Sequence, residues 1–291
     1  MKIIDGKNIA SKLNADLKKH LVTIKKKFKI NPCLIVILVG EIKASKIYVR
    51  NKEIIAREIG IESKVIKTSA DISEKELLTI INECNHDDNI DGILVQLPLP
   101  QHINADNIIK AINPQKDVDG FHPENIGLLA LGRPKVIPCT PYGCYKLLNS
   151  ITSLEGKNII ILGRSSIVGK PLSYLLTSKN STITLAHSKS EKINSLCADK
   201  DIVIAAIGIP NIVKKDWIKP GAIVIDVGIN SVKDDTGKTK ILGDVDFQNI
   251  LPIVSFITPV PGGVGPMTIH CLLENTISLA ISKKNIDYKL I

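Results

Sequence analysis

The chain has 291 residues, of which 44% are hydrophobic, 23% are charged and 3% are aromatic. At roughly 150 residues per domain, this length predicts about two domains, each large enough for its own core. The composition excludes a disordered chain, a collagen-like repeat and a small disulfide-stapled module.

The charge is positive but poor in arginine. Lysine and arginine total 38 against 29 acidic residues, a formal net charge of +9, yet only four of the 38 are arginines. Surfaces that bind nucleic acid usually present arginine forks and aromatic platforms, and this chain has few of either. We therefore expect a lysine-rich surface that attracts small anions, and no nucleic-acid partner.

Cysteine and histidine patterns indicate neither a metal site nor a disulfide framework. The six cysteines include no Cys-x-x-Cys pair, and the six histidines are scattered. The N-terminus has no signal-peptide core, and the longest apolar stretches, 33–40 and 202–213, are shorter than the roughly 20 residues of a membrane-spanning helix. We expect a reduced, cytoplasmic protein with no metal and no membrane partner.

The first part of the chain alternates helical and strand patterns. In order, these predict a helix over 7–27, a strand over 33–39, a helix over 44–59, a strand over 64–68, a helix from the Ser73/Glu76 capping box to about 85, and a strand over 92–96. Continuous apolar strands between helices predict βαβ units and a parallel sheet.

Residues 98–141 are rich in Pro, Gly and Asn, which predicts a hinge between domains. Thr140 and Pro141 then predict the N-cap and first residue of a helix to about 149. Further strands are predicted over 158–162, 181–186, 201–207 and 222–227, and a last helix runs from Pro266 to about 282. The predicted fold class is α/β with two domains: a catalytic α/β domain with parallel strands over 1–119, to which a C-terminal helix (268–291) returns, and a Rossmann-type domain over 120–267.

A glycine turn follows the predicted strand 158–162. A strand, a glycine turn and a helix in this order place backbone N–H groups and the positive helix end near a phosphate. Arg164 and Ser165 stand where the usual G-x-G-x-x-G motif has its second glycine, so the turn from Gly163 to Gly169 by itself also fits a plain connector.

The end of the next strand favours NADP over NAD. An NAD site would place Asp or Glu there for the ribose 2′-hydroxyl, whereas this chain has His187, Ser188 and Lys189. With Arg164 also in reach, a 2′-phosphate would meet several donors and a positive field.

Two polar side chains share one face of the predicted helix 44–59, because Tyr48 and Lys52 are four residues apart. Tyr-x-x-x-Lys also occurs in short-chain dehydrogenases, but there it follows the nucleotide turn, whereas here it comes long before Gly163. The order of the motifs therefore counts against that class.

Other polar positions lie at strand ends and in the hinge. Gln96 ends a strand, where ligands bind in open α/β sheets. Asp117 and Asp119 lie in the hinge without the further acidic residues of a metal site. The turn over 258–268 holds three glycines and three prolines, which suits either a close approach of backbone to a ligand or a link between domains.

Together these motifs resemble the bifunctional methylenetetrahydrofolate dehydrogenase/cyclohydrolase family, from Gly6 to Thr276. The resemblance is carried, in family order, by Tyr48-Val-Arg-Asn-Lys52, Gly92-Ile-Leu-Val-Gln-Leu-Pro-Leu-Pro100, Lys116-Asp-Val-Asp-Gly120, Pro138-Cys-Thr-Pro141, Gly163-Arg-Ser165 with Val168-Gly169, and Pro259-Val-Pro-Gly-Gly-Val-Gly-Pro-Met-Thr268. It implies that NADP⁺ oxidises 5,10-methylenetetrahydrofolate and that water then opens the methenyl cation to 10-formyltetrahydrofolate. It also implies a homodimer, with roles in one-carbon metabolism and purine biosynthesis.

The resemblance assigns roles to individual residues. Lys52 is implied as the catalytic residue of the hydrolytic step, with Gln96 orienting it, Tyr48 packing on the folate and Asp119 binding the pterin ring. The remaining substrate contacts are implied for Leu97, Pro259, Gly262 and Gly263. NADP contacts are implied for Gly163, Arg164, Ser165, Ser188 and Ile229, with Arg164 and Ser188 on the 2′-phosphate. His270 and Cys271 depart from the family pattern and leave the packing of the last helix open.

Two alternatives stay open at this point. One is an NADP-dependent dehydrogenase of another small substrate, in which Tyr48 and Lys52 act as an acid pair and folates are ignored. The other is an NADP-binding sensor without catalysis, against which the intact Lys52, Gln96 and Asp119 count.

Overall fold

The computed structural model describes residues 2–233 and 237–286. The chain divides into two compact units, each formed by two stretches of sequence. The three-stranded unit comprises Lys12–Cys139 and Ile269–Ile291, and the five-stranded unit comprises Met1–Ser11 and Thr140–Thr268. The mixed α/β architecture confirms the predicted fold class, whereas the domain boundaries predicted after residues 119 and 267 stay a prediction.

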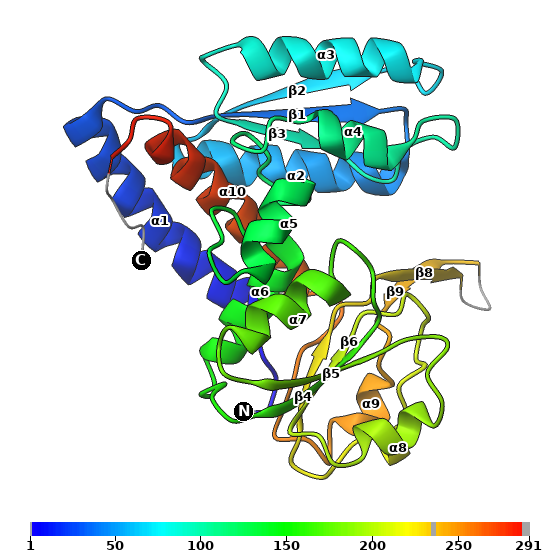
Figure 1. Ribbon diagram of the computed structural model, residues 1–291. Helices are drawn as coiled ribbons and strands as arrows, with labels where there is room; N and C mark the ends of the chain where they lie inside the picture. The colour runs from blue at the N-terminus through cyan, green and yellow to red at the C-terminus, as the bar shows by residue number, and fades with distance from the viewer. Residues whose placement is uncertain (1, 234–236, 287–291) are drawn as a thin grey trace. The chain divides into compact units, whose positions relative to one another are not determined.

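The three-stranded unit contains a parallel sheet with strand order β2-β1-β3. Its elements are α1 (Gly6–Phe28, most of which belongs here), β1 (Cys33–Val39), α2 (Lys43–Ile59), β2 (Glu62–Thr68), α3 (Glu74–His86), β3 (Gly92–Val95), α4 (Ala105–Ala111) and α5 (Pro123–Ala130). Every residue of β1 is buried, as its continuous apolar run predicts. Helix α2 covers one face of this sheet and helices α3 and α4 cover the other (Figure 1).

Three helices of this unit begin at side chains that cap their N-termini. The predicted capping box is confirmed: the Ser73 side chain accepts from the backbone N–H of Glu76, whose side chain accepts from the Ser73 backbone. Helices α4 and α5 lie in the stretch predicted as an irregular hinge. They were missed because they are short, yet each has a capping side chain, Asn104 and His122 respectively.

The five-stranded unit contains a parallel sheet with strand order β10-β7-β6-β4-β5. Its elements are α6 (Cys139–Asn149), β4 (Asn158–Leu162), α7 (Gly169–Thr177), β5 (Thr182–Ala186), α8 (Ile193–Cys197), β6 (Ile202–Ala205), η1 (Lys215–Trp217), β7 (Ile223–Asp226), β8 (Asn230–Lys233), β9 (Thr239–Leu242), α9 (Phe247–Ile250) and β10 (Phe256–Ile257). The chain leaves β4 for β5 on one side and then returns to β6 on the other, so the direction of winding reverses beside β4. Ligands bind at the carboxyl ends of strands at such a point.

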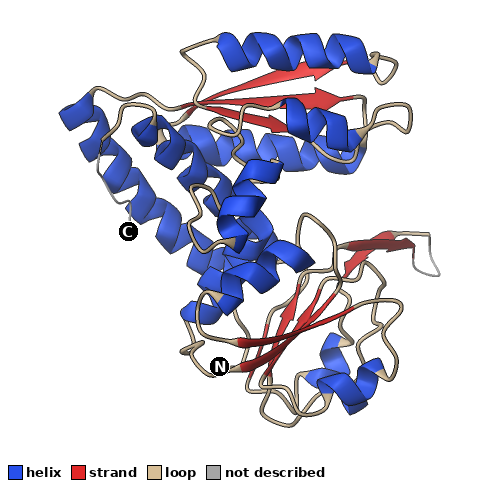
Figure 2. Cartoon of the chain, in the orientation of Figure 1, coloured by secondary structure: helices blue, strands red, loops and turns tan. Residues whose placement is uncertain are grey.

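Two details of this unit correct the prediction. Helix α6 begins at Cys139, so Thr140 lies inside the helix and is not its N-cap. The antiparallel pair β8 and β9, seen in Figure 2, and the two-residue strand β10 have no long apolar run and were not predicted.

The last helix, α10 (Val264–Ser282), returns to the three-stranded unit as predicted. From Ile269 onward its residues belong to that unit, and the Asn275 side-chain amide donates to the backbone oxygens of Val118 and Ile137, each at 2.9 Å. In the described part of the chain, no helix is both long and apolar enough to cross a membrane.

Candidate active site

All four predicted catalytic residues, Tyr48, Lys52, Gln96 and Asp119, belong to the three-stranded unit. Helix α2 presents Tyr48 and Lys52 on one face, and the Lys52 ammonium nitrogen lies 4.7 Å from the centre of the Tyr48 ring. The same nitrogen donates a hydrogen bond to Gln96 Oε1 at 3.1 Å. Gln96 is the first residue after β3, where its backbone N–H donates to Ile37 of β1. Sheet pairing between β1 and β3 therefore places it beside α2.

The Lys52 side chain is buried. The residue is only 5% exposed, and burial lowers the pKa of its ammonium, while the nearby Asp119 carboxylate acts in the opposite direction. A buried amine with a lowered pKa is neutral over a wider range of pH than an exposed lysine, and so is better suited to accept a proton.

Asp119 is the acidic partner of this site. Burial raises the pKa of its carboxyl to about 6, although the positive charge of Lys52 lowers it. The segment that carries it runs along the free edge of β3, where Ile93 N–H donates to Lys116 O at 2.7 Å and Ile93 forms a parallel bridge with Asp117. Sheet geometry therefore sets the position of Asp119.

Asp117 has a structural role. Its carboxylate accepts from the backbone N–H groups of Gly120 and His122 and from the side-chain amide of Asn125, at 2.8–3.0 Å. The residue is 2% exposed. Of the two acids in the Lys116–Gly120 motif, Asp117 thus folds the turn and Asp119 is left to face Lys52.

Cys139 is a member of this site to which sequence reasoning assigned no role. Its thiol hydrogen-bonds to the Asp119 side chain and to the Val118 backbone oxygen, the latter at 3.4 Å. The signal was present in the Pro138–Pro141 motif. However, neither periodicity nor spacing shows that this motif approaches Asp119.

A second site lies in the five-stranded unit, at the carboxyl ends of β4, β5 and β6. It is a cavity of about 410 Å³ lined by Leu162, Gly163, Arg164, Ser165, Ala186, His187, Ser188, Ile193, Ala206, Ile207, Ile209, Ile212 and Trp217. Four of the predicted NADP residues, Gly163, Arg164, Ser165 and Ser188, are among them. The fifth, Ile229, follows β7, is 65% exposed and does not line this cavity.

The turn after β4 requires glycine. Gly163 has φ +124°, and a Cβ there would lie 2.1 Å from the Ala206 backbone oxygen. The Ser165 hydroxyl accepts from the backbone N–H groups of Val168 and Gly169 at 3.1 and 3.3 Å, and so caps the start of α7.

The cavity has the donor set of a phosphate site. Its lining residues include the guanidinium of Arg164 and the hydroxyl of Ser188, both exposed, but no carboxylate. The turn that presents Ser188 is held because Lys189 N–H donates to His187 Nδ1 and His187 N–H donates to Ser190 Oγ. A ribose 2′-phosphate therefore fits this end of the cavity better than a free 2′-hydroxyl.

Three of the four remaining predicted substrate residues, Pro259, Gly262 and Gly263, lie on the turn that follows β10 in the five-stranded unit. The fourth, Leu97, directly follows Gln96 in the three-stranded unit. This turn packs on the first residues of the chain, because Lys7 N–H donates to Gly262 O at 3.0 Å and a Cβ on Gly6 would lie 1.9 Å from Gly263 O. The turn is therefore fixed in shape by close backbone contacts.

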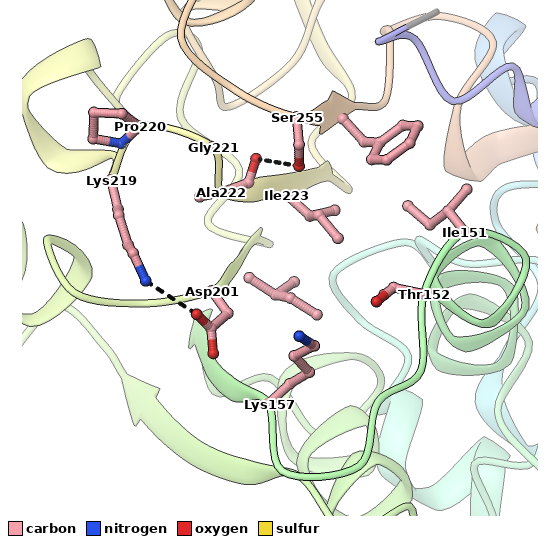
Figure 3. A pocket seen from close by; sticks show the side chains of 12 residues that line it. Ile151, Thr152, Lys157, Asp201, Lys219, Pro220, Gly221, Ala222, Ile223 and Ser255 are labelled. Carbon is pink, nitrogen blue, oxygen red and sulfur yellow. Dashed lines mark hydrogen bonds and ion pairs between the residues drawn. The ribbon is translucent and has the colours of Figure 1, made fainter.

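A further hollow of about 290 Å³ lies at the opposite, amino-terminal edge of the five-stranded sheet (Figure 3). Lys157, Lys219 and Asp201 reach it, and Lys219 pairs with Asp201 at 3.1 Å. None of the predicted site residues lines it. Within the described residues, no group of three or more His, Cys, Asp or Glu side chains is arranged to hold a metal ion.

Comparison with known proteins gives a family for both parts of the chain. Residues 4–119 match the model "Tetrahydrofolate dehydrogenase/cyclohydrolase, catalytic domain", and residues 138–284 match "Tetrahydrofolate dehydrogenase/cyclohydrolase, NAD(P)-binding domain". Bifunctional protein FolD of Zymomonas mobilis is 50% identical over 96% of each chain. The FolD protein of a Wolbachia from Drosophila simulans is 52% identical, over 98% of this chain and 97% of that protein.

Solved structures agree with this similarity. The FolD methylenetetrahydrofolate dehydrogenase/cyclohydrolase of Campylobacter jejuni has a TM-score of 0.91 at 45% identity, covering 97% of this chain and 99% of its own. The Trypanosoma brucei enzyme, solved with NADP and an inhibitor, has a TM-score of 0.93 at 34% identity, covering 98% of both chains.

Proposed function

The chain belongs to the tetrahydrofolate dehydrogenase/cyclohydrolase family, and from this premise we propose how its own residues carry out the two reactions. It is a bifunctional enzyme of one-carbon metabolism. It oxidises 5,10-methylenetetrahydrofolate with NADP⁺ and hydrolyses the resulting 5,10-methenyl cation to 10-formyltetrahydrofolate. The observation that carries the residue assignment is the hydrogen bond from the buried Lys52 to Gln96.

NADP⁺, when bound, supplies the hydride acceptor of the first step. Loss of hydride leaves a cation that the substrate's own nitrogens stabilise, so this step needs orientation more than an acid or a base. Arg164 and Ser188 hold the 2′-phosphate by charge-assisted hydrogen bonds, while the Gly163 turn and Ser165 receive the pyrophosphate end. Ile229 contributes an apolar contact to the nucleotide.

The second step adds water to the methenyl carbon with loss of one proton, which gives a neutral carbinolamine. The carbinolamine then opens to the 10-formyl product: its hydroxyl proton leaves as the carbonyl forms, the bond from the carbon to N5 breaks, and N5 takes up a proton. Lys52 is the group that takes the proton lost from the attacking water, because burial favours its neutral amine and the cationic substrate disfavours a second positive charge beside it. Gln96 orients the amine. When the proton has been transferred, Lys52 is an ammonium ion that Asp119 and the face of the Tyr48 ring stabilise.

The folate is recognised by groups of both polar and apolar character. Asp119 accepts hydrogen bonds from the amino and N–H groups of the pterin, and Tyr48 packs against the ring. Leu97, Pro259, Gly262 and Gly263 line the remainder of the folate. In this scheme residues 1–119, with the helix over 268–291, form the folate domain and residues 120–267 the NADP domain.

The proposal extends to the setting of the enzyme. We infer a cytoplasmic homodimer that supplies 10-formyltetrahydrofolate to reactions of purine biosynthesis. The family membership and the expected use of NADP support this inference.

The testing experiment follows both products at once. Purified protein is mixed with 5,10-methylenetetrahydrofolate and NADP⁺, with NAD⁺ as the control, while NADPH and the methenyl absorbance are recorded. NADPH with little accumulated methenyl is expected. Equal accumulation of NADPH and methenyl would contradict the hydrolytic role, and folded protein that forms no NADPH would contradict the dehydrogenase role.

A further inference from the structure

Two buried carboxylates of the five-stranded unit have no part in the scheme above. Asp226, at the end of β7, is 3% exposed and Asp244, two residues after β9, is fully buried. Asp226 accepts backbone N–H bonds from Gly228, Asp244 and Val245, each at 2.9 Å. This carboxylate therefore holds the segment after β9 against the end of β7.

The Asp244 carboxylate reaches the segments after β6 and β7. Its Oδ2 accepts from the backbone N–H groups of Ile207 and Gly208 at 2.6 and 2.9 Å. Its Oδ1 accepts from the side-chain amide of Asn230 at 2.8 Å. A single buried side chain thus fixes two separate segments, both at the carboxyl edge of the sheet.

Two glycines lie against these carboxylates. A Cβ on Gly228 would lie 2.2 Å from Asp244 Oδ1, and a Cβ on Gly243 would lie 1.8 Å from Asp226 Oδ2. A Cβ at either position would overlap a carboxylate oxygen, so both positions require glycine.

One of the segments held by Asp244 lines the cavity of the proposed nucleotide site, and the other carries Ile229, which we propose to contact the nucleotide outside that cavity. Ala206, Ile207 and Ile209 line the 410 Å³ cavity. Ile229 stands between Gly228, which bonds to Asp226, and Asn230, which bonds to Asp244. Without the Asp244 carboxylate, the partly buried N–H groups of Ile207 and Gly208 would lack an acceptor, and the segment would have to move to find one.

We propose that Asp244 is a positioning residue for nucleotide binding: it sets the shape of residues 206–209 and of the turn that carries Ile229, without contacting the ligand. The inference rests on the proposed NADP site. Loss of Asp244 should therefore weaken nucleotide binding but leave the hydrolytic step unchanged, because hydrolysis of methenyltetrahydrofolate requires no nucleotide and Lys52 lies in the other unit.

The experiment compares Asp244→Ala with Asp244→Asn. Each variant is assayed for the KM of NADP⁺, for the kcat of hydrolysis with methenyltetrahydrofolate alone, and for NADP⁺ binding by the fluorescence of Trp217, the single tryptophan, which lines the cavity. The alanine variant is expected to raise the KM and Kd of NADP⁺ at least about tenfold while hydrolysis stays within about twofold.

The asparagine variant serves as conservative rescue. It keeps one carbonyl oxygen for Ile207 and Gly208, and the Asn230 amide can turn over to present its own oxygen to the new amide group. We expect a rise in NADP⁺ Kd of less than about threefold. Asp246→Ala is the matched control, because Asp246 is close in sequence but pairs with Lys214; its NADP⁺ Kd should equal that of the wild type.

Asn230→Ala is a milder variant that removes one partner of Asp244, and its expected effect is a twofold to fivefold rise in NADP⁺ Kd, on the order expected for one hydrogen bond. Unchanged NADP⁺ affinity in Asp244→Ala and Asn230→Ala would overturn the inference. So would parallel loss of both activities in Asp244→Ala and Asp244→Asn. Failure of the proposed function looks different, since the wild type itself would then form no NADPH.

Discussion

Gln96 presents its carbonyl oxygen, not its amide nitrogen, to Lys52. The Gln96 Nε2 group donates to the Leu97 backbone oxygen at 2.7 Å, which leaves Oε1 as the acceptor 3.1 Å from the Lys52 nitrogen. A carbonyl oxygen can accept a hydrogen bond from either an ammonium ion or a neutral amine, although the bond from the ammonium ion is the stronger one. Gln96 therefore holds Lys52 in place through both protonation states while the lone pair of the amine stays available for a water molecule.

The first prediction concerns Lys52→Met. This variant keeps the length and apolar body of the side chain but has no basic nitrogen. Hydrolysis of the methenyl cation should fall by about 10²–10⁴-fold, the usual contribution of a general base. NADP-dependent oxidation should be retained, since that step depends on orientation. The two rates are measured separately with methenyl- and methylenetetrahydrofolate.

Lys46→Met is the control for this variant, because Lys46 lies on the same helix, is exposed and pairs with Glu41. It should leave both rates unchanged. If Lys52→Met, with its fold intact, lost both activities equally, Lys52 would be a binding residue and the assignment of the base would be wrong.

The second prediction concerns the pH dependence of hydrolysis. The rate requires neutral Lys52, so it rises with pH through the pKa of Lys52, which burial lowers and Asp119 raises. Asp119→Asn removes a negative charge, lowers this pKa further and should move the rising limb to lower pH. Gln96→Glu adds a negative charge beside the amine and should move the limb to higher pH.

The measured quantity is the pH at the midpoint of the rising limb in a plot of kcat against pH. This midpoint does not change when a variant only binds folate more weakly. Glu53→Gln, next to Lys52 in sequence but paired with Arg57 at 2.7 Å, provides the matched control and should leave the midpoint in place. Shifts of the same sign in Asp119→Asn and Gln96→Glu would refute Lys52 as the titrating group.

Strand positions could be predicted from the sequence because β1 and β4 contain continuous apolar runs, over residues 33–39 and 159–162. The Lys52 site was only partly accessible to the same reasoning. A spacing of four residues puts Tyr48 beside Lys52, but only the pairing of β1 with β3 brings Gln96 to them. The bonds of Asp244 to Ile207 and Gly208 join positions 36 and 37 residues apart and leave no periodic pattern in the sequence.

The third prediction concerns cofactor choice. Arg164 offers a guanidinium to the 2′-phosphate, which only NADP⁺ carries. Arg164→Ala should lower the preference for NADP⁺ over NAD⁺ by about 10–100-fold, through a higher KM for NADP⁺ with little change for NAD⁺. Arg133→Ala, at an exposed arginine outside the cavity, should change neither value. Equal losses for the two nucleotides would place Arg164 away from the 2′-phosphate.

The fourth prediction concerns the turn after β4. Gly163→Ala forces a Cβ to within 2.1 Å of the Ala206 oxygen at a φ of +124°, so the turn must shift. NADP⁺ binding should be lost and the unfolding temperature should fall. Gly127→Ala in helix α5 adds the same methyl group where nothing lies within 4 Å, and it should be neutral or slightly stabilising. Tight NADP⁺ binding by Gly163→Ala would contradict the assigned turn.

The last prediction concerns His270, a buried histidine in α10. The residue is 1% exposed; its Nε2 lies 3.1 Å from Glu274 Oε2 one turn along α10, and its Nδ1 lies 2.8 Å from Asn14 Oδ1. Both ring nitrogens thus face oxygen acceptors inside the three-stranded unit. His270 therefore joins α10 to α1 through polar contacts, at a depth where most neighbouring side chains are apolar.

Removal of either side chain takes this polar contact away from a buried position, so His270→Leu and Glu274→Leu should each destabilise the protein by about 1–3 kcal/mol. The double variant replaces the pair by apolar side chains and should recover most of that loss. Urea unfolding of the four proteins measures the coupling, with Glu83→Leu on the exposed face of α3 as the control. Additive losses in the double variant would mean that His270 and Glu274 stabilise the helix independently.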